Sequence, residues 1–415
     1  MNRRAFLKAI TSSTVAAAAL TVNGPGLWFR NAHAANGKMM LIVSQRGGCD
    51  GLNTCVPYGD PDYYKLRPTI AIARPKANNP ESALDLDGFF GLHPALSGLK
   101  EIYTQGDLAV MPAVHYPDSL RSHFHSQSVI ETGTPALTPD GWLNRYLQEY
   151  PAVVDLQAIA FSKRMPELMR GSLPVAVVSD LDEFALNMDT TERDMLVASL
   201  ERVYSQATSL VSPHTEKLLS TGIDMIDDVE LMKMIDPSSY QPSNGAVYPD
   251  TTFGRQMRQV AFLAKSGVGL EFASVEINGW DTHSSQGGGE VGGRQAVAFK
   301  EFGDGIAAFH RDMGALMANV VIVTGTEFGR TAAENASNGT DHGGASTWFA
   351  VGKNVQGGIY GNWPGLAPGQ LQDNRQLQFN IDFRDVFSEV LARHLGNSQL
   401  ANIFPGHSQQ AVGFL

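Results

Sequence analysis

The sequence predicts an α/β fold with a mostly parallel central sheet flanked by helices. Short continuous apolar runs recur along the chain, at residues 39–43, 108–114, 270–277 and 320–324. Such runs are typical of strands buried on both faces, as in parallel sheets. Segments with apolar residues at helical spacing separate them, and this alternation is the pattern of an α/β layer structure.

The expected elements follow this alternation in order. The first strand, 39–43, ends in a glycine loop at residues 46–51. A helix is expected at 93–105, where Leu96, Leu99 and Ile102 recur at helical spacing, and a second strand at 108–114. A helix at 122–131 then ends near Gly133. The order resumes later, with helices at 253–265, 296–317 and 383–395 and strands at 270–277, 320–324 and 348–351.

The middle of the chain, residues 134–249, is less regular. Helices are expected at 142–149 and 192–204, and a strand at 175–179, with turn-rich loops between them. We therefore predict that 134–249 is an insertion or cap on a domain that spans residues 35–415.

The first 34 residues have the composition of an export signal. Arg3 and Arg4 precede an uncharged apolar run at residues 9–22, and Ala32-His33-Ala34 fits a signal peptidase. The run has roughly 14 residues, fewer than the ~20 that a spanning helix needs. The paired arginines resemble the twin-arginine motif, which implies the twin-arginine translocase as a partner and a periplasmic or secreted mature chain. An uncleaved anchor or an amphipathic terminus is the alternative.

The charge of the chain excludes two classes of partner. The net charge is −11, and removing the four positive charges of residues 1–34 leaves −15. An acidic surface argues against nucleic acid and against an anionic membrane surface. We expect no integral membrane segment in the mature chain, because no other apolar run reaches spanning length. The two cysteines, Cys49 and Cys55, could form a disulfide or remain two buried thiols.

Acidic residues and histidines follow several of the predicted strands. In an open α/β sheet this edge is where ligands bind, and carboxylates and imidazoles are common ligands of divalent cations. We therefore expect a site for one or two ions of zinc, manganese or calcium. Its candidate ligands are Asp50, Asp281, His283, Glu327, Asp341 and His342. Each segment alone could be an ordinary turn.

Ser122 lies at the expected start of a helix. It could cap that helix, or it could be a nucleophile, with Arg121 adding positive charge for a bound phosphate or sulfate. We take Ser122 and Arg121 as the candidate catalytic residues. His123, His125 and Arg330 are the candidate substrate-binding residues, and histidines in such positions are also commonly core residues.

Five short segments together resemble a widespread bacterial family of exported proteins, domain family fifteen-hundred-and-one. They are residues 45–53, 121–124, 279–283, 326–330 and 341–343. The family is placed with sulfatases in the alkaline phosphatase superfamily. The resemblance therefore implies an alkaline-phosphatase-like sandwich whose metal site lies at the carboxyl ends of the central strands.

The resemblance also implies roles for individual residues. Asp50, Asp281, His283 and His342 match metal ligands, and Ser122 falls near the nucleophile position. The superfamily's Asp-His pair is Glu327-Phe328 here, so one imidazole is missing, and His123 or His125 could replace it. The Cys-x-Pro-Ser-Arg signature of sulfatases is absent.

Two functions follow from these observations. The first is an exported metal-dependent hydrolase of phosphate or sulfate esters, acting on a small-molecule or glycan ester. The alternative is a non-catalytic periplasmic binding or assembly protein on the same fold.

Overall fold

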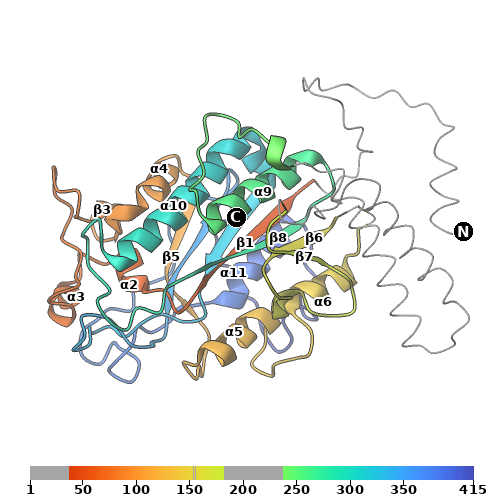
Figure 1. Cartoon of the computed structure of the whole chain (residues 1–415). Helices are drawn as coiled ribbons and strands as arrows, with labels where there is room; N and C mark the ends of the chain where they lie inside the picture. The colour runs from red at the N-terminus through yellow and green to blue at the C-terminus, as the bar shows by residue number, and fades with distance from the viewer. Residues whose placement is uncertain (1–36, 153, 155, 182–236) are drawn as a thin grey trace, which may run out of the picture. The chain divides into compact units, whose positions relative to one another are not determined.

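The computed structural model describes residues 37–152, 154, 156–181 and 237–415. Its main feature is a mixed sheet with the strand order β11-β5-β10-β9-β1-β8-β6-β7, in which β12 also pairs with β5 (Figure 1). Among the described strand pairs of this sheet, only those made by β10 are antiparallel. The predicted class, α/β with a mostly parallel central sheet flanked by helices, is confirmed.

The strands are short and almost wholly buried. Their bounds are β1 Met39–Arg46, β5 Leu108–His115, β6 Ala158–Phe161, β7 Ala176–Val178, β8 Phe272–Asn278, β9 Val320–Gly325, β10 Ser346–Val351, β11 Gly358–Ile359 and β12 Ile381–Asp382. Every residue of β5 is buried. Burial on both faces explains why these strands are continuous apolar runs in the sequence.

Helices cover both faces of the sheet (Figure 1). One group is α4 Ser97–Thr104, α9 Thr252–Ser266 and α10 Arg294–Met313, and α10 packs against both of the others. The other group is α5 His123–Thr132, α6 Trp142–Glu149 and α11 Phe383–Glu389, which continues as a π-helix over Val390–His394. Val129, Trp142 and Phe387 of this group share one core with Met40 and Ile42 of β1.

A small second sheet lies after the first long strand. It has the order β2-β4-β3, formed by Cys55–Val56, Gly91–Leu92 and Leu84–Asp85. The short helices α2 Gly51–Thr54 and α3 Pro61–Leu66 belong to the same region. Short 3-10 turns complete the chain, at Pro94–Leu96, Glu167–Met169, Pro237–Ser239 and Gly314–Asn319.

The irregular middle of the chain contributes to the main sheet. The predicted helix at 142–149 and strand at 175–179 correspond to α6 and β7, and the sequence analysis missed β6, which pairs with β7 and β8. The predicted helix at 192–204 lies outside the described residues. None of the helices in the described part of the chain has the length and apolar composition that crossing a bilayer requires.

The two cysteines do not form a disulfide. Cys49 and Cys55 are both free and both buried. The Cys49 sulfur lies 3.3 Å from the Gln45 amide and 3.4 Å from the Thr54 hydroxyl. Burial raises the pKa of both thiols above the ordinary range, so both stay protonated near neutral pH.

Candidate metal centre

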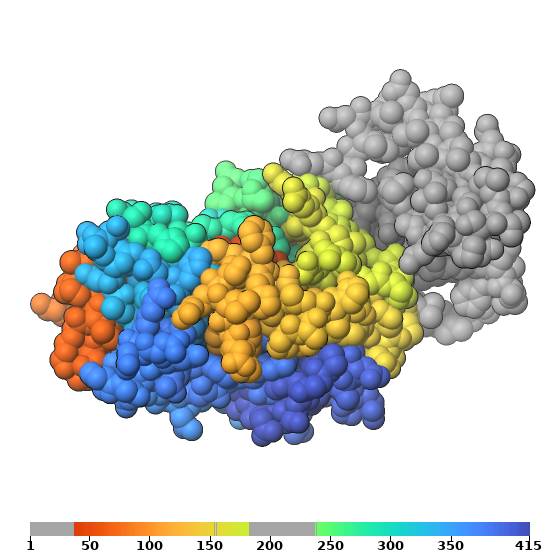
Figure 2. Space-filling view, turned by 90° about the horizontal axis from the view of Figure 1, so that it is seen from below, coloured from red at the N-terminus to blue at the C-terminus, as the bar shows by residue number. Residues whose placement is uncertain are grey.

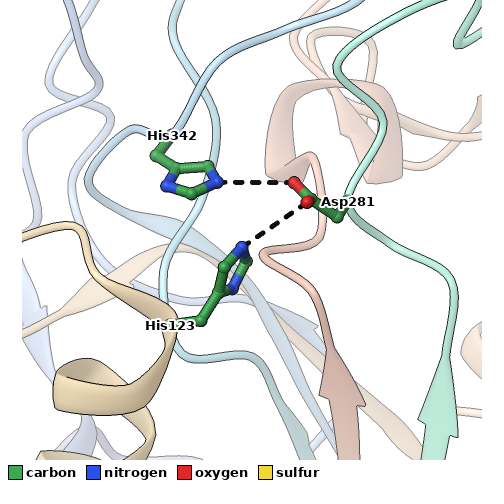
Figure 3. A group of neighbouring side chains, drawn as sticks. All are labelled: His123, Asp281 and His342. Carbon is green, nitrogen blue, oxygen red and sulfur yellow. Dashed lines mark ion pairs between the residues drawn. The ribbon is translucent and has the colours of Figure 1, made fainter.

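Four connections meet at one edge of the main sheet. The loops after β1, β8 and β9 leave the carboxyl ends of neighbouring parallel strands. The connection that leads into β10 reaches the same edge, because β10 runs antiparallel to β9. This arrangement brings together Asp281, which follows β8, His342, which precedes β10, and His123, the first residue of α5 (Figure 3).

His123 is oriented by a buried carboxylate. Its Nδ1 lies 2.8 Å from Oε1 of Glu327, and its Nε2 lies 3.7 Å from Oδ2 of Asp281. The hydrogen bond to Glu327 raises the pKa of His123. Burial alone would raise the pKa of Glu327, but hydrogen bonds from His123 and its other donors lower it. The Glu327 carboxylate is therefore ionised and holds the proton of His123 at Nδ1.

His342 and His283 have the same arrangement with other acceptors. Nδ1 of His342 lies 2.9 Å from the carbonyl oxygen of Arg121, and Nδ1 of His283 lies 3.1 Å from Oδ1 of Asp341. Because an oxygen faces each Nδ1, that nitrogen is the proton donor in the neutral ring. Each Nε2 then carries a lone pair.

These lone pairs converge on one carboxylate. Oδ1 of Asp281 lies 3.1 Å from Nε2 of His283 and 3.4 Å from Nε2 of His342, and the two Nε2 atoms lie 3.1 Å apart. Such a close set of lone pairs is repulsive without a proton or a cation between them. With ligand bonds of about 2.0 Å, the edge of a zinc tetrahedron is about 3.3 Å. The three distances among His283, His342 and Asp281 lie on either side of that value, and the 3.7 Å between Nε2 of His123 and Oδ2 of Asp281 is somewhat longer.

The cluster is walled by an aromatic ring on one side and open on the other. The buried ring of Phe328 lies 4.8 Å from the ring of His123 and 4.7 Å from that of His342, measured between centroids. Gly48 has a φ of +70°, and a Cβ there would lie 2.5 Å from the Phe328 ring. The side chain of Asp281, by contrast, is 45 % exposed. A ligand can therefore reach the cluster from solvent.

Arg330 was predicted to bind substrate, but in the structure its side chain lies buried behind Asp281. Its side chain is fully buried, and its Nη2 donates to Oδ1 of Asp281 at 2.6 Å. The same guanidinium donates to the carbonyl oxygens of Gly47, Gly48 and Thr340. Partial burial by itself would raise the pKa of Asp281, but the hydrogen bond and the charge of Arg330 lower it. Arg330 orients Asp281 and has no exposed surface for a substrate.

Asp50 also lies outside the cluster. Its carboxylate accepts hydrogen bonds from Nη1 and Nη2 of Arg67 at 2.6 and 2.9 Å, and from the amide of Gln286 at 2.6 Å. The backbone N–H of Leu52 donates to it as well, so that Asp50 caps α2. Both Asp50 and Arg67 are buried. Arg67 therefore supplies the positive charge at the position where the sequence predicted a metal ion.

The remaining predicted residues lie around the cluster. Glu327 and Asp341 act on it through His123 and His283, since each carboxylate faces an Nδ1. Ser122 is exposed at the N-cap position of α5 and makes no capping hydrogen bond. The side chain of His125 forms no hydrogen bond or ion pair with the described residues. His123, predicted to bind substrate and also named as a possible replacement for the missing imidazole, lies in the cluster itself.

Comparison with known proteins places the chain in a family. Residues 108–403 match the family model described as Protein of unknown function (DUF1501). The chain belongs to this family. The match covers most of the chain and confirms the resemblance to this family; four of the five short segments lie within the matched residues, and residues 45–53 precede them. No curated protein sequence matches the chain.

Several solved structures are similar to this family member. Phosphonate monoester hydrolase of Agrobacterium radiobacter has a TM-score of 0.34 at 10 % identity, over 90 % of this chain and 78 % of that one. Alkaline phosphatase from the Antarctic bacterium TAB5 has the same TM-score and identity, over 87 % and 99 %. The zinc complex of the C-terminal periplasmic domain of EcEptC from Escherichia coli matches equally well, over 76 % and 74 %. At these values no residue role follows from the likeness.

Proposed function

We propose that this protein is an exported hydrolase of phosphate or sulfate esters that depends on a single metal ion, held by His123, His283, His342 and Asp281. The observation that supports it best is the convergence of three Nε2 atoms on the Asp281 carboxylate, with every Nδ1 facing an oxygen. Hydrogen-bonded second nitrogens of this kind are usual for histidines that bind metals.

The donor set selects among the predicted ions. Three imidazoles and one carboxylate suit zinc, whereas calcium takes six to eight oxygen ligands. A second ion has no free carboxylate at Asp50, because Arg67 already balances that charge. We therefore expect one equivalent of zinc.

The surroundings of the cluster fit an anionic substrate. Arg294 donates to the backbone oxygen of Asp281 at 3.3 Å, and Nη2 of Arg375 lies 3.9 Å from Oδ2 of Asp341. Arg121 is partly exposed beside them. Nη1 of Arg121 lies 3.6 Å from Oδ2 of Asp373, so Arg121 and Arg375 each have a carboxylate near them. Arginine is well suited to phosphate and sulfate oxygens.

The candidate nucleophile of this proposal is Ser122. The Ser122 hydroxyl is exposed, forms no capping hydrogen bond and precedes His123 directly. A bound divalent cation supplies Lewis acidity for an ester oxygen and stabilises the charge that develops on it. The residues of the chain bind and orient the ester, with Arg121, Arg294 and Arg375 around its anionic group.

Metal content is the first test. We expect about one equivalent of zinc in the purified protein by mass spectrometry, and loss of that zinc in Asp281→Ala and His342→Ala. Asp304→Ala removes a half-buried acid on α10 that forms an ion pair with Lys300, away from the cluster, so this variant should keep its zinc. The zinc-loaded protein should then hydrolyse p-nitrophenyl esters of phosphate or sulfate. Failure of the wild type to bind zinc, even after incubation with excess ion, would refute the proposal.

One observation favours the non-catalytic alternative. Phe328 stands where the resemblance predicts a metal ligand. Asp50 and Arg330 form buried hydrogen bonds with other residues, so neither can contact a substrate. A periplasmic binding or assembly protein would keep the metal and the fold without turnover. Tight zinc binding with no hydrolysis of any phosphate or sulfate ester would support this function.

Export through the twin-arginine route is part of the proposal. Residues 1–34 lie outside the described residues, so the support is the sequence motif with Arg3 and Arg4. Replacing both arginines by lysine should leave the precursor in the cytoplasm, as cell fractionation would show. Unchanged export of that variant would contradict the assignment.

A further inference from the structure

We propose that the substrate of this site is amphiphilic: an anionic ester group binds at the metal cluster, and an apolar alkyl or aryl group packs on Leu120 and Phe124. This inference rests on the proposed function and specifies its substrate class. Leu120 and Phe124 flank residues 121–123 in the sequence, and these two side chains are called the apolar rim.

The rim is exposed to an unusual degree. Phe124 is 86 % exposed and Leu120 is 67 % exposed, and Phe124 is the most exposed large apolar residue of the described chain. Single exposed apolar residues are common on protein surfaces and need no explanation. Here, however, two of them lie on either side of a cluster residue. Figure 2 shows the gold surface of this part of the chain beside the blue surface of the later segments.

The backbone of this loop is fixed by the cluster. Asp118 and Arg121 have positive φ values of 58° and 54°, which non-glycine residues adopt at a cost. The carbonyl oxygen of Arg121 accepts the hydrogen bond from Nδ1 of His342, and Nη1 of Arg121 donates to Gln376 at 3.1 Å. The backbone that carries Leu120 and Phe124 is therefore tied to the cluster through the neighbouring residues Arg121 and His123.

The charges beside the rim distinguish a small amphiphile from a bilayer. Arg121 lies two residues before His123, and Arg294 donates to the backbone oxygen of Asp281. Arg121 and Arg375 also have the carboxylates of Asp373 and Asp341 within 4 Å, which an anionic group would have to compete with. The three arginines fit the single anionic group of one molecule. An anionic membrane would instead meet a protein whose net charge is −11, which disfavours surface attraction.

The apolar area that a ligand would cover on Leu120 and Phe124 determines the expected gain in affinity. Covering most of an exposed Phe or Leu side chain is sufficient for a change in affinity of about tenfold. We therefore expect octyl phosphate to bind about tenfold more tightly than methyl phosphate. The preference should fall to about threefold or less in the double variant Leu120→Ser, Phe124→Ser.

The test measures binding and turnover separately. Calorimetry on the zinc-loaded protein gives the affinities for methyl and octyl phosphate, and rates on methyl and octyl p-nitrophenyl phosphate give the same ratio for hydrolysis. Leu316→Ser is the matched control, since Leu316 is exposed but precedes β9, at the opposite edge of the sheet. A third arm offers phosphatidate vesicles in place of monomeric octyl phosphate.

The outcomes separate this inference from the function on which it rests. An octyl preference that is lost in the double variant and kept in Leu316→Ser supports the rim. Equal affinities for the two phosphates, with zinc bound and esters hydrolysed, overturn the rim and leave the hydrolase. An octyl preference without turnover supports the rim and refutes the hydrolase. Binding to vesicles but not to monomeric octyl phosphate overturns the rim as a substrate site.

Discussion

Replacing Glu327 by glutamine should weaken zinc binding about 10- to 100-fold while leaving the fold intact. Glu327 does not contact the proposed ion. It acts through His123, whose Nδ1 lies 2.8 Å from its Oε1. Loss of an outer carboxylate of this kind usually costs 10- to 100-fold in metal affinity, which is about 1.4 to 2.7 kcal/mol.

The hydrogen bonds around this carboxylate allow the amide to fit. Oε1 of Glu327 accepts from the backbone N–H of Gly47 at 2.9 Å, from Nδ1 of His123 and from the Gln127 amide at 3.1 Å. Oε2 lies 3.0 Å from the hydroxyl of Thr326. A glutamine can keep its oxygen toward the three donors and donate its NH₂ to the Thr326 oxygen. The substitution therefore removes the charge and keeps the contacts.

The change in charge also acts on the basicity of His123. The hydrogen bond to Glu327 raises the pKa of His123 above its ordinary value. Without that negative charge the imidazole becomes less basic, and a less basic Nε2 is a weaker ligand. The lower basicity of His123 and the loss of its orientation by Glu327 therefore both weaken zinc binding.

Equilibrium competition with a chelator would measure the effect at fixed pH. Glu271→Gln is the matched control, because Glu271 is another buried glutamate and directly precedes β8, at the opposite edge of the sheet. Thermal unfolding of the metal-free proteins would show that both variants are folded. Unchanged zinc affinity in Glu327→Gln, or an equal loss in Glu271→Gln, would refute the reasoning.

Three further predictions concern the rest of the molecule. Arg67→Ala should lower the free energy of unfolding by about 3–5 kcal/mol in denaturant titrations, because it leaves Asp50 buried and unpaired. Cys49 and Cys55 should resist alkylation in the native protein and react once it is unfolded, as mass spectrometry would show, because both thiols are buried. Burial lowers the pKa of His115 to about 3 from an ordinary 6.5. Between those values only the unfolded state binds the proton, so stability rises with pH there. For His115 alone, lowering the pH from 7 to 5 should therefore cost about 2 kcal/mol, and His115→Phe should remove that share. Burial also lowers the pKa of His93 and of His394 to about 4, so these two residues add losses of the same sign.

Each of these predictions has a contrary outcome. Arg311→Ala breaks an exposed pair with Glu101 and should cost less than about 1 kcal/mol, so an equal loss in both arginine variants would contradict the buried-pair argument. Rapid native alkylation, or the mass loss of a disulfide, would contradict two protected thiols. A pH dependence in His115→Phe as steep as in the wild type would show that other groups control it.

The strands and their arrangement could be predicted because burial on both faces leaves a direct trace in composition. Residues 108–114 and 320–324 were expected as strands, and the structure has β5 and β9 there. β6 was missed because its four residues, Ala158–Phe161, stand in a turn-rich region with no periodicity to extend. The small sheet was missed for the same reason, since its strands have two residues each.

The site was predicted in its location and only partly in its residues. Acids and histidines after the strands do gather at one edge, as Asp281 and His342 demonstrate. Their individual roles depend on contacts between distant segments. Asp50 was expected at the cluster, but it pairs with Arg67, and Arg330 was expected at a substrate, but it is buried against Asp281. No pattern within a single loop indicates which carboxylate meets a guanidinium and which meets an imidazole.

The cluster connects parts of the chain that are distant in sequence. His123, Asp281 and His342 are separated by about 160 and about 60 residues, and joining such segments closes two long loops of the backbone. An ion that binds only the joined arrangement stabilises the folded chain by its full binding free energy. A nascent chain that stops short of His342 cannot hold that ion. If the chain is exported as proposed, metal loading would therefore report that synthesis has passed His342 and that these segments have folded together.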